Sequence, residues 1–157
     1  MPVTNATFTI ERLLNASPER VFAAYTSLEA KGAWFKAPSD METLARELDF
    51  RVGGHERFHA RWPSGLVTDF QATYRDIVEN ERIVLVYDLF HNADKLSVSL
   101  QTIELVAEGG ATRLLHTEQA SYFTGGIEAV QAREHGTTWH VDNLVAVIEG
   151  KEARAFA

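Results

Sequence analysis

The sequence contains no cysteine among its 157 residues. The chain therefore cannot form disulfides, a cysteine-ligated zinc site or a thiol nucleophile. No apolar run approaches the roughly 18 residues that a membrane-spanning helix needs, so no membrane association is expected. Residues 1–14 have no basic region followed by an apolar one, as a signal peptide would have. We therefore expect a cytoplasmic location.

Basic residues are outnumbered and scattered. The chain has 15 Lys and Arg against 22 Asp and Glu, for a formal net charge of −7. An acidic chain repels phosphate backbones unless it carries a local basic patch, so nucleic-acid binding is not expected. A Gly-rich phosphate loop is also missing, because Gly53-Gly54 and Gly109-Gly110 stand where hairpin turns are expected. We predict no cofactor.

The remaining composition is typical of a globular protein, with 45% hydrophobic and 24% charged residues. The length fits one domain. The sequence shows no internal repeat, low-complexity tract or Pro/Gly-rich linker. We therefore predict a single domain over residues 1–157.

Short segments with alternating apolar and polar residues fill the middle of the chain. The clearest runs from 67 to 78, where Phe70, Ala72 and Tyr74 share one face. Further strands are expected over residues 7–14, 45–52, 55–62, 82–90, 96–106 and 112–122. Successive strands joined by short turns predict an antiparallel meander.

Helical patterns occur near both ends of the chain. Ser17 is a suitable N-cap and Pro18 a suitable first residue for a helix over 18–25. A second short helix is expected over 28–33. A long final helix is expected to begin near residue 136 or earlier and to end before Gly150, a natural cap.

The final helix carries an apolar stripe suited to covering the sheet. Val141, Leu144, Val145 and Ile148 are spaced at i, i+3, i+4 and i+7. A sheet that is apolar on one face must cover that face, and this helix is the long element available. We predict an α+β helix-grip fold (START/Bet v-like), with a curved antiparallel sheet of about six or seven strands, two short helices and a long C-terminal helix.

Seven segments follow one another in a distinctive order and spacing: residues 15–22, Trp34-Phe35 with Pro38, 47–54, 76–84, 112–119, 133–137 and 142–144. In this order and spacing they resemble the activator of Hsp90 ATPase homologue family, within the START-like (SRPBCC) superfamily. The resemblance implies a cavity between the sheet and the final helix. The family name comes from a eukaryotic co-chaperone domain; a lone domain lacks that co-chaperone's second domain, so a chaperone partner is the weaker expectation.

Aromatic residues gather on the predicted inner face of the sheet. Phe58, Trp62, Phe70 and Tyr74 alternate with Arg and Asp residues, which are too polar to be buried unpaired. Such a face predicts a site for a small apolar or aromatic molecule. The alternative is that these side chains simply fill the core. The residues predicted to contact a ligand are Phe58, Trp62, Phe70, Tyr74, Tyr87, His116, Glu118, Tyr122, Val141 and Leu144.

His116 and Glu118 are the most distinctive pair. They lie two residues apart on one strand, so both side chains point to the same face. One interpretation is an acid–base pair, or a site that holds a ligand's polar group. The other is structural, with Glu118 paired to an arginine such as Arg133 and His116 bonded to Tyr74 or Tyr87.

The other histidines do not have the spacing of a metal site. His55 and His59 are separated by about 13 Å along a strand, too far for one ion. His135 and His140 lack a partner at i+4. We predict no metal.

The tryptophans and the segment before the final helix have two interpretations each. Trp34 and Trp139 stand at the cavity mouth or an interface, or they are packing anchors. The segment over 122–131 is expected to be a loop, either a lid with a glycine hinge or a simple connector.

Three functions are consistent with the sequence. The first is a binding protein for a small apolar or aromatic molecule. The second is a cyclase or hydrolase that uses His116 and Glu118, and the third is a chaperone-interacting protein. A homodimer formed through exposed tryptophans or strand edges is a further expectation.

Overall fold

The structure is a computed structural model that describes residues 2–38 and 40–151. The outer ends of the predicted domain, residues 1 and 152–157, lie outside the described residues.

Seven strands and three helices make up the described chain. In order they are β1 (Thr4–Leu14), α1 (Pro18–Ala23), α2 (Leu28–Gly32), β2 (Glu42–Leu48), β3 (His55–Arg61), β4 (Val67–Val78), β5 (Arg82–His91), β6 (Asp94–Glu108), β7 (Ala111–Tyr122) and α3 (Gly126–Ile148).

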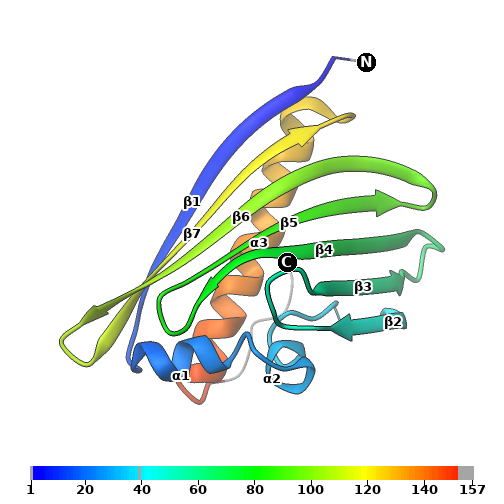
Figure 1. Cartoon of the computed structure of the whole chain (residues 1–157). Helices are drawn as coiled ribbons and strands as arrows, with labels where there is room; N and C mark the ends of the chain where they lie inside the picture. Colours follow the sequence, from blue (N-terminus) through cyan, green and yellow to red (C-terminus); the bar gives the residue numbers. More distant parts are fainter. Residues whose placement is uncertain (1, 39, 152–157) are drawn as a thin grey trace.

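The strands form one sheet in the order β1-β7-β6-β5-β4-β3-β2, and every pair is antiparallel. The sheet is curved, α3 runs along one face of it, and α1 and α2 lie at one end (Figure 1). The first strand thus closes the meander beside the last one. This confirms the predicted helix-grip architecture. In the described part of the chain, no helix is both long and apolar enough to cross a membrane.

Local sequence explains how the two short helices begin. The Ser17 and Ser27 side chains cap α1 and α2 by accepting backbone N–H bonds from Arg20 and Ala30. Such caps satisfy amides that a helix start leaves unpaired. The Arg20 guanidinium also donates to the carbonyl of Ile148 at 2.8 Å. This bond ties α1 to the end of α3, where a cation is favoured by the helix dipole.

The turn between β2 and β3 depends on Gly54. A Cβ at this position would lie 2.0 Å from the carbonyl oxygen of Asp49. The backbone of the same turn pairs with Tyr74, through Gly53 N–H to the Tyr74 carbonyl and Tyr74 N–H to the Gly54 carbonyl. The turn is therefore fastened to β4, and only glycine fits it.

Two predicted boundaries are wrong. The segment over 122–131 is mostly helical, because α3 begins at Gly126 and leaves only residues 123–125 as a connection. The predicted strand over 45–52 instead begins at residue 42 and ends at Leu48. Phe50 leaves the strand and turns inward against Phe22 and Tyr74, with ring centroids 5.7 and 5.1 Å apart. Packing of this aromatic side chain overrides the alternating pattern.

The core lies between the sheet and the C-terminal half of α3. Val141, Leu144 and Ile148 are buried there against Phe8 and Ile10 of β1. The predicted apolar stripe of the final helix therefore packs on the sheet. The N-terminal half of α3 is different: Val130 packs on Ala120 and Tyr122 of β7, but other residues of this half line a cavity.

Candidate ligand cavity

A cavity of about 580 Å³ lies between the inner face of the sheet and the N-terminal half of α3. Its walls come from β3 to β7, from α3, and from the segment around α2. This volume lies within the range of small-molecule sites, which is about 300–1,000 Å³.

Seven of the ten predicted contact residues line this cavity. They are Phe58, Trp62, Phe70, Tyr87, His116, Tyr122 and Val141. Tyr74, Glu118 and Leu144 do not line it. Leu144 lies in the packed core, and Tyr74 and Glu118 are buried behind the wall, where each supports a polar cluster.

The sheet wall is largely aromatic. Phe70 packs on Tyr87 with ring centroids 4.6 Å apart. Phe35, from the segment after α2, crosses to this wall and packs edge-on against Phe58 and Phe70 at 5.6 and 5.1 Å. These contacts hold the rings beside the cavity instead of inside it. The interpretation that the aromatic residues simply fill the core therefore holds for Tyr74, but not for Phe58, Trp62 and Phe70, which line the cavity.

Part of the helix wall is made of small residues. Ala129, Ala132 and Gly136 lie three or four residues apart on α3 and all face the cavity. A Cβ added at Gly136 would have no atom within 4 Å. Short side chains on this half of the helix therefore create the open space.

One end of the cavity holds a buried ion pair. Lys31 Nζ lies 2.5 Å from Glu56 Oε1, and the two side chains are 6% and 4% exposed. The Tyr74 hydroxyl donates to the same carboxylate at 2.6 Å. Burial, and then the Glu56 charge, raise the pKa of Tyr74 far above its usual value. Lys31 also lies 4.9 Å from the ring centroid of Phe35, within reach of a cation–π interaction.

The other end is closed by Arg133, which reaches from α3 to the sheet. Its guanidinium donates to the Tyr87 hydroxyl at 3.0 Å and to Ser97 at 2.8 Å, and lies 3.5 Å from Glu118. Glu118 accepts further bonds from Tyr87 at 2.9 Å and from Gln101 at 3.1 Å. The fully buried carboxylate is therefore engaged on both oxygens, as the structural interpretation of Glu118 expects.

His116 is buried in the cavity wall with no hydrogen-bond partner on either ring nitrogen. It bonds neither Glu118 nor Tyr74 nor Tyr87. Burial, with smaller contributions from the charges of Lys31 and His140, lowers the pKa of His116 to about 3. The imidazole is thus neutral near pH 7, with one N–H donor and one acceptor nitrogen.

Two tyrosine hydroxyls in the wall resemble His116. Tyr25 and Tyr122 are each 2% exposed, and neither hydroxyl has a partner. Burial raises the pKa of both. Such groups usually find a hydrogen-bond partner when they are buried, so three unpartnered residues in one cavity are unusual.

The tryptophans have different roles. Trp34 is 5% exposed, and its indole N–H donates to the Ala24 carbonyl at 2.9 Å. Trp62 donates to Thr68 at 3.3 Å. Trp34, Trp62 and Trp139 all line the cavity. Trp34 is therefore a packing anchor that also forms part of the wall.

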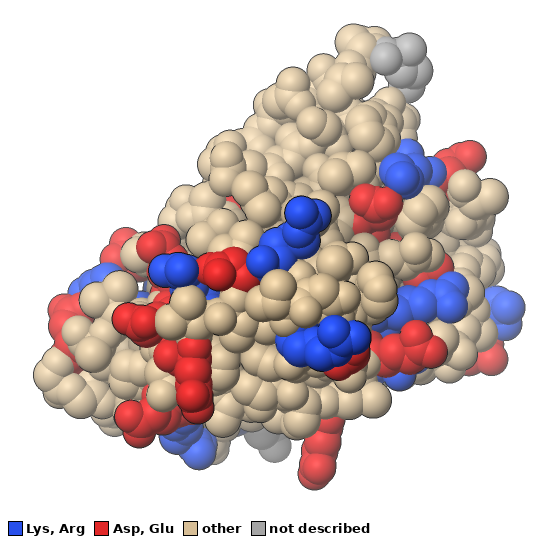
Figure 2. Space-filling model, viewed as in Figure 1, with Lys and Arg blue, Asp and Glu red and all other residues tan. Residues whose placement is uncertain are grey.

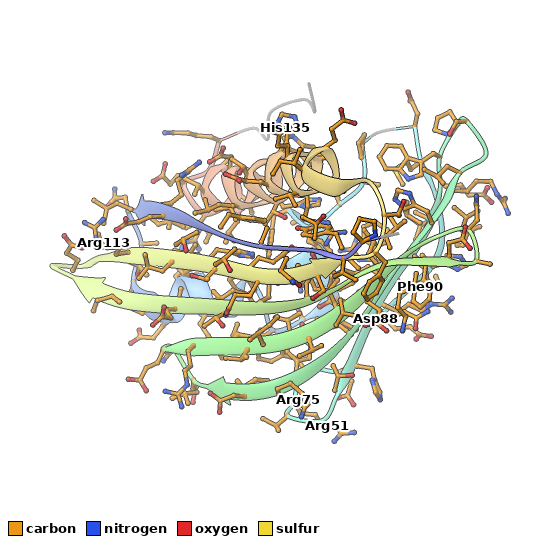
Figure 3. All side chains as sticks on the ribbon, turned by 90° about the horizontal axis from the view of Figure 1, so that it is seen from above. Arg51, Arg75, Asp88, Phe90, Arg113 and His135 are labelled. Carbon is orange, nitrogen blue, oxygen red and sulfur yellow. The ribbon has the colours of Figure 1, made fainter. Side chains whose placement is uncertain are left out.

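The histidines outside β7 do not assemble a metal site. Among the described residues, no group of three or more His, Cys, Asp or Glu side chains is placed to hold an ion. His140 bonds the Lys36 carbonyl at 3.0 Å, and burial lowers its pKa to about 4. His135 lies on the side of α3 that faces away from the sheet (Figure 3).

The outer face of the sheet carries the charges. Arg57 and Asp69 form a two-pronged ion pair across β3 and β4, at 3.0 and 2.8 Å. Arg51 and Arg75 point away from α3 on this side of the molecule (Figure 3). On the face seen in Figure 2, blue and red side chains are interleaved and form no continuous basic patch. This pattern is typical of a solvated face.

Sequence reasoning missed four polar residues of the cavity and its support, namely Tyr25, Lys31, Glu56 and His140. Glu56 had a readable signal, because it lies two residues before Phe58 and so shares the inner face. No sequence pattern predicted the burial of Lys31, because a lysine on a five-residue helix is usually solvated.

Comparison with known proteins identifies relatives across nearly the whole chain. The family model described as Activator of Hsp90 ATPase homolog 1-like protein matches residues 15–149. No curated protein matches the sequence.

Solved structures share the fold closely. An uncharacterized protein from Rhizobium leguminosarum is 37% identical, covers 96% of this chain and 98% of its own, and has a TM-score of 0.88. The Mll3558 protein from Rhizobium loti is 35% identical over 93% of this chain and 99% of its own, with a TM-score of 0.85. An AHSA1-like protein from Aeromonas hydrophila is 23% identical over 92% and 93%, with a TM-score of 0.69, and supports the fold alone.

Proposed function

This chain belongs to the Activator of Hsp90 ATPase homolog 1-like family, and we propose that it functions by binding a small, mostly apolar molecule between the sheet and α3. The observation that carries the proposal is the cavity of about 580 Å³, lined by aromatic residues of the sheet and, in part, by small residues of the helix.

The construction of the cavity supports this function. Side chains of ordinary size at Ala129, Ala132 and Gly136 would fill the space, as Leu144 and Ile148 do further along α3. Apolar walls with a few polar groups are typical of sites that take small organic ligands. The ligand would remain between the two layers that the fold already holds together.

The surroundings of His116 and Glu118 do not favour an acid–base pair. Glu118 does not line the cavity, and both of its oxygens are engaged by Tyr87 and Gln101. A general acid or base must reach the reacting group directly or through one water. We therefore propose binding alone.

The direct test is binding of Nile red, an uncharged apolar dye whose emission shifts to the blue in apolar surroundings. We expect saturable binding by the wild-type chain. Gly136→Leu places a side chain in the open space and should weaken binding at least about tenfold without destabilising the helix, since leucine is the better helix former.

The matched control is Glu128→Leu, which adds the same side chain on the exposed side of the same helix. It should bind the dye like the wild type. Equal binding by Gly136→Leu, or no saturable binding by the wild type, would remove the cavity as the functional site. Native mass spectrometry of the purified protein gives an independent readout of co-purified ligand.

A further inference from the structure

The unpartnered polar groups of the interior are concentrated in the cavity wall. Among the described residues, buried side-chain atoms without a hydrogen-bond partner occur on only four residues. Three of them, Tyr25, His116 and Tyr122, line the cavity, and Asn143 does not. Each of the three is more than nine-tenths buried. Polar groups left unpaired in an otherwise satisfied interior point to a partner that the protein does not itself supply.

Two of these groups, His116 and Tyr25, lie on the side of the cavity that contains Lys31. The charge of Lys31 acts on His116. The Lys31 ammonium also lies 5.9 Å from the ring centroid of Trp34, which packs against Tyr25 at 4.9 Å. Tyr122 belongs to the opposite end, where its ring centroid is 5.3 Å from the guanidinium carbon of Arg133.

The charges deep in the cavity are already balanced. Lys31 is paired with Glu56, and Arg133 with Glu118. Lys36, which also lines the cavity, is only half-buried. To pair with Lys31 or Arg133, a ligand carboxylate or phosphate would have to displace a buried glutamate. Otherwise its negative charge would stay unpaired next to that glutamate.

The free groups match a hydroxyl. A neutral imidazole offers one acceptor nitrogen, and a tyrosine hydroxyl can donate. A ligand hydroxyl can donate to the first and accept from the second at the same time. A hydroxyl can pair with either ring nitrogen of His116, because it both donates and accepts, whereas a carbonyl oxygen can pair only with the protonated one.

We propose that the cavity takes an uncharged, mostly apolar ligand that bears a hydroxyl group, such as a phenol, and that His116 and Tyr25 bind this hydroxyl. This inference rests on the proposed function and adds the chemical class of the ligand. His116 accepts the hydroxyl proton in a hydrogen bond, and Tyr25 donates to its oxygen. The aromatic wall around Phe58 and Phe70 holds the apolar body.

The test compares three probes of one ring system: naphthalene, 2-naphthol and 2-naphthoate. Their affinities are measured near neutral pH by fluorescence titration. We expect 2-naphthol to bind about tenfold more tightly than naphthalene, because two buried groups gain partners. We expect 2-naphthoate to bind more weakly than naphthalene. Tightest binding of the anion, or equal binding of naphthalene and 2-naphthol, would overturn the proposal.

Variants assign the hydroxyl preference to residues. His116→Leu should lower the preference for 2-naphthol to the two- to threefold that Tyr25 supplies while keeping naphthalene affinity, and Tyr25→Phe should reduce the preference two- to threefold, roughly one neutral hydrogen bond. His116→Gln retains a donor and an acceptor and should keep part of the preference. Phe58→Leu, the matched control, should weaken both ligands by the same factor.

The outcomes separate this inference from the proposed function. Failure of Nile red and all three probes to bind the wild type removes the proposed function itself. Binding of Nile red and naphthalene without a gain from the hydroxyl removes only the inference. A folded His116→Leu that keeps the full preference also removes it. The wild-type probe series and His116→Gln decide the matter if His116→Leu does not fold.

Discussion

The two halves of α3 face the same sheet but meet it in different ways. The C-terminal half buries Val141, Leu144 and Ile148 in direct contact with the core. The N-terminal half presents Ala129, Ala132 and Gly136 to a cavity. The backbone of the helix is continuous through both. Small side chains on the N-terminal half therefore leave room for a ligand, although Val130 of this half packs on Ala120 and Tyr122.

The polar groups divide in the same way. In the C-terminal half, the Asp142 ion pair with Arg12 lies at the surface, with both side chains about one-third exposed. In the N-terminal half, Arg133 reaches a fully buried carboxylate. The packed half thus carries its ion pair at the surface, whereas the cavity half holds a buried one. Four predictions test this difference, beginning with the largest effect.

Leu144→Ala should lower the free energy of unfolding by about 3 kcal/mol, because it leaves a void in the packed half. Urea denaturation measures the change. Gly136→Ala is the matched control in the other half. Its methyl group meets open space and it removes a glycine from the helix interior, so it should raise stability by about 0.5–1 kcal/mol. A loss below about 1 kcal/mol for Leu144→Ala would mean that the C-terminal half is not tightly packed.

Arg133→Met should lower the free energy of unfolding by about 2–3 kcal/mol, because Glu118 then stays buried without a cation. This loss of stability is slightly smaller than for a buried carboxylate without any hydrogen-bond donor, because Tyr87 and Gln101 still donate to Glu118. Replacing both partners, as Arg133→Met with Glu118→Gln, should recover part of the loss. A double variant as unstable as the single one would show that the ion pair is not the source of the effect.

Acidification should weaken the cavity half. Burial holds the pKa of His116 near 3, against an ordinary value of 6.5. Below about pH 6.5 the unfolded chain takes up a proton that the folded chain does not, so stability falls as pH falls toward 3. We expect this residue to cost about 1–2 kcal/mol at about pH 5.

Thermal or urea unfolding across this pH range measures how the free energy of unfolding changes with pH. His140, with its pKa lowered to about 4, adds to the same trend. His116→Leu should flatten the dependence, whereas Leu144→Ala should shift the whole curve without changing its slope. An unchanged slope in His116→Leu would contradict the buried neutral imidazole.

Asp142→Asn should have the smallest effect, at most about 1 kcal/mol, because solvent screens the ion pair with Arg12. The difference from wild type should shrink further at high ionic strength. The comparison of melting temperatures at low and high salt measures it. A salt-independent loss of about 2 kcal/mol or more would place this pair among the buried ones.

Much of the fold was predictable because it rests on local patterns. The alternation over 67–78 coincides with the bounds of β4, and Ser17 caps α1 as expected. The start of α3 was not predictable in the same way. Within residues 126–135, Val130 packs on Ala120 and Tyr122, but small residues face the cavity, so the apolar pattern of this part of the helix is weak.

The candidate site was only partly predictable. Period-two alternation places Phe58, Phe70 and His116 on the inner face, where the structure also has them. The alternation predicts the side of the sheet on which a side chain lies, but not whether that side chain reaches the cavity. Tyr74 and Glu118 share that face, yet they lie behind the cavity wall within polar clusters. Whether a side chain lines a space depends on the neighbours that close over it.

By itself, the sequence determined the antiparallel meander, the caps, the face that most strand residues present, and the absence of any thiol chemistry. These follow from period, turn residues and composition, which act over a few neighbouring residues. Only the tertiary structure decided that Lys31 meets Glu56, that Arg133 meets Glu118, and that His116 meets no protein partner. Such pairings join residues far apart in the chain. Because these groups are buried, the presence or absence of a hydrogen-bond partner has a large effect on stability.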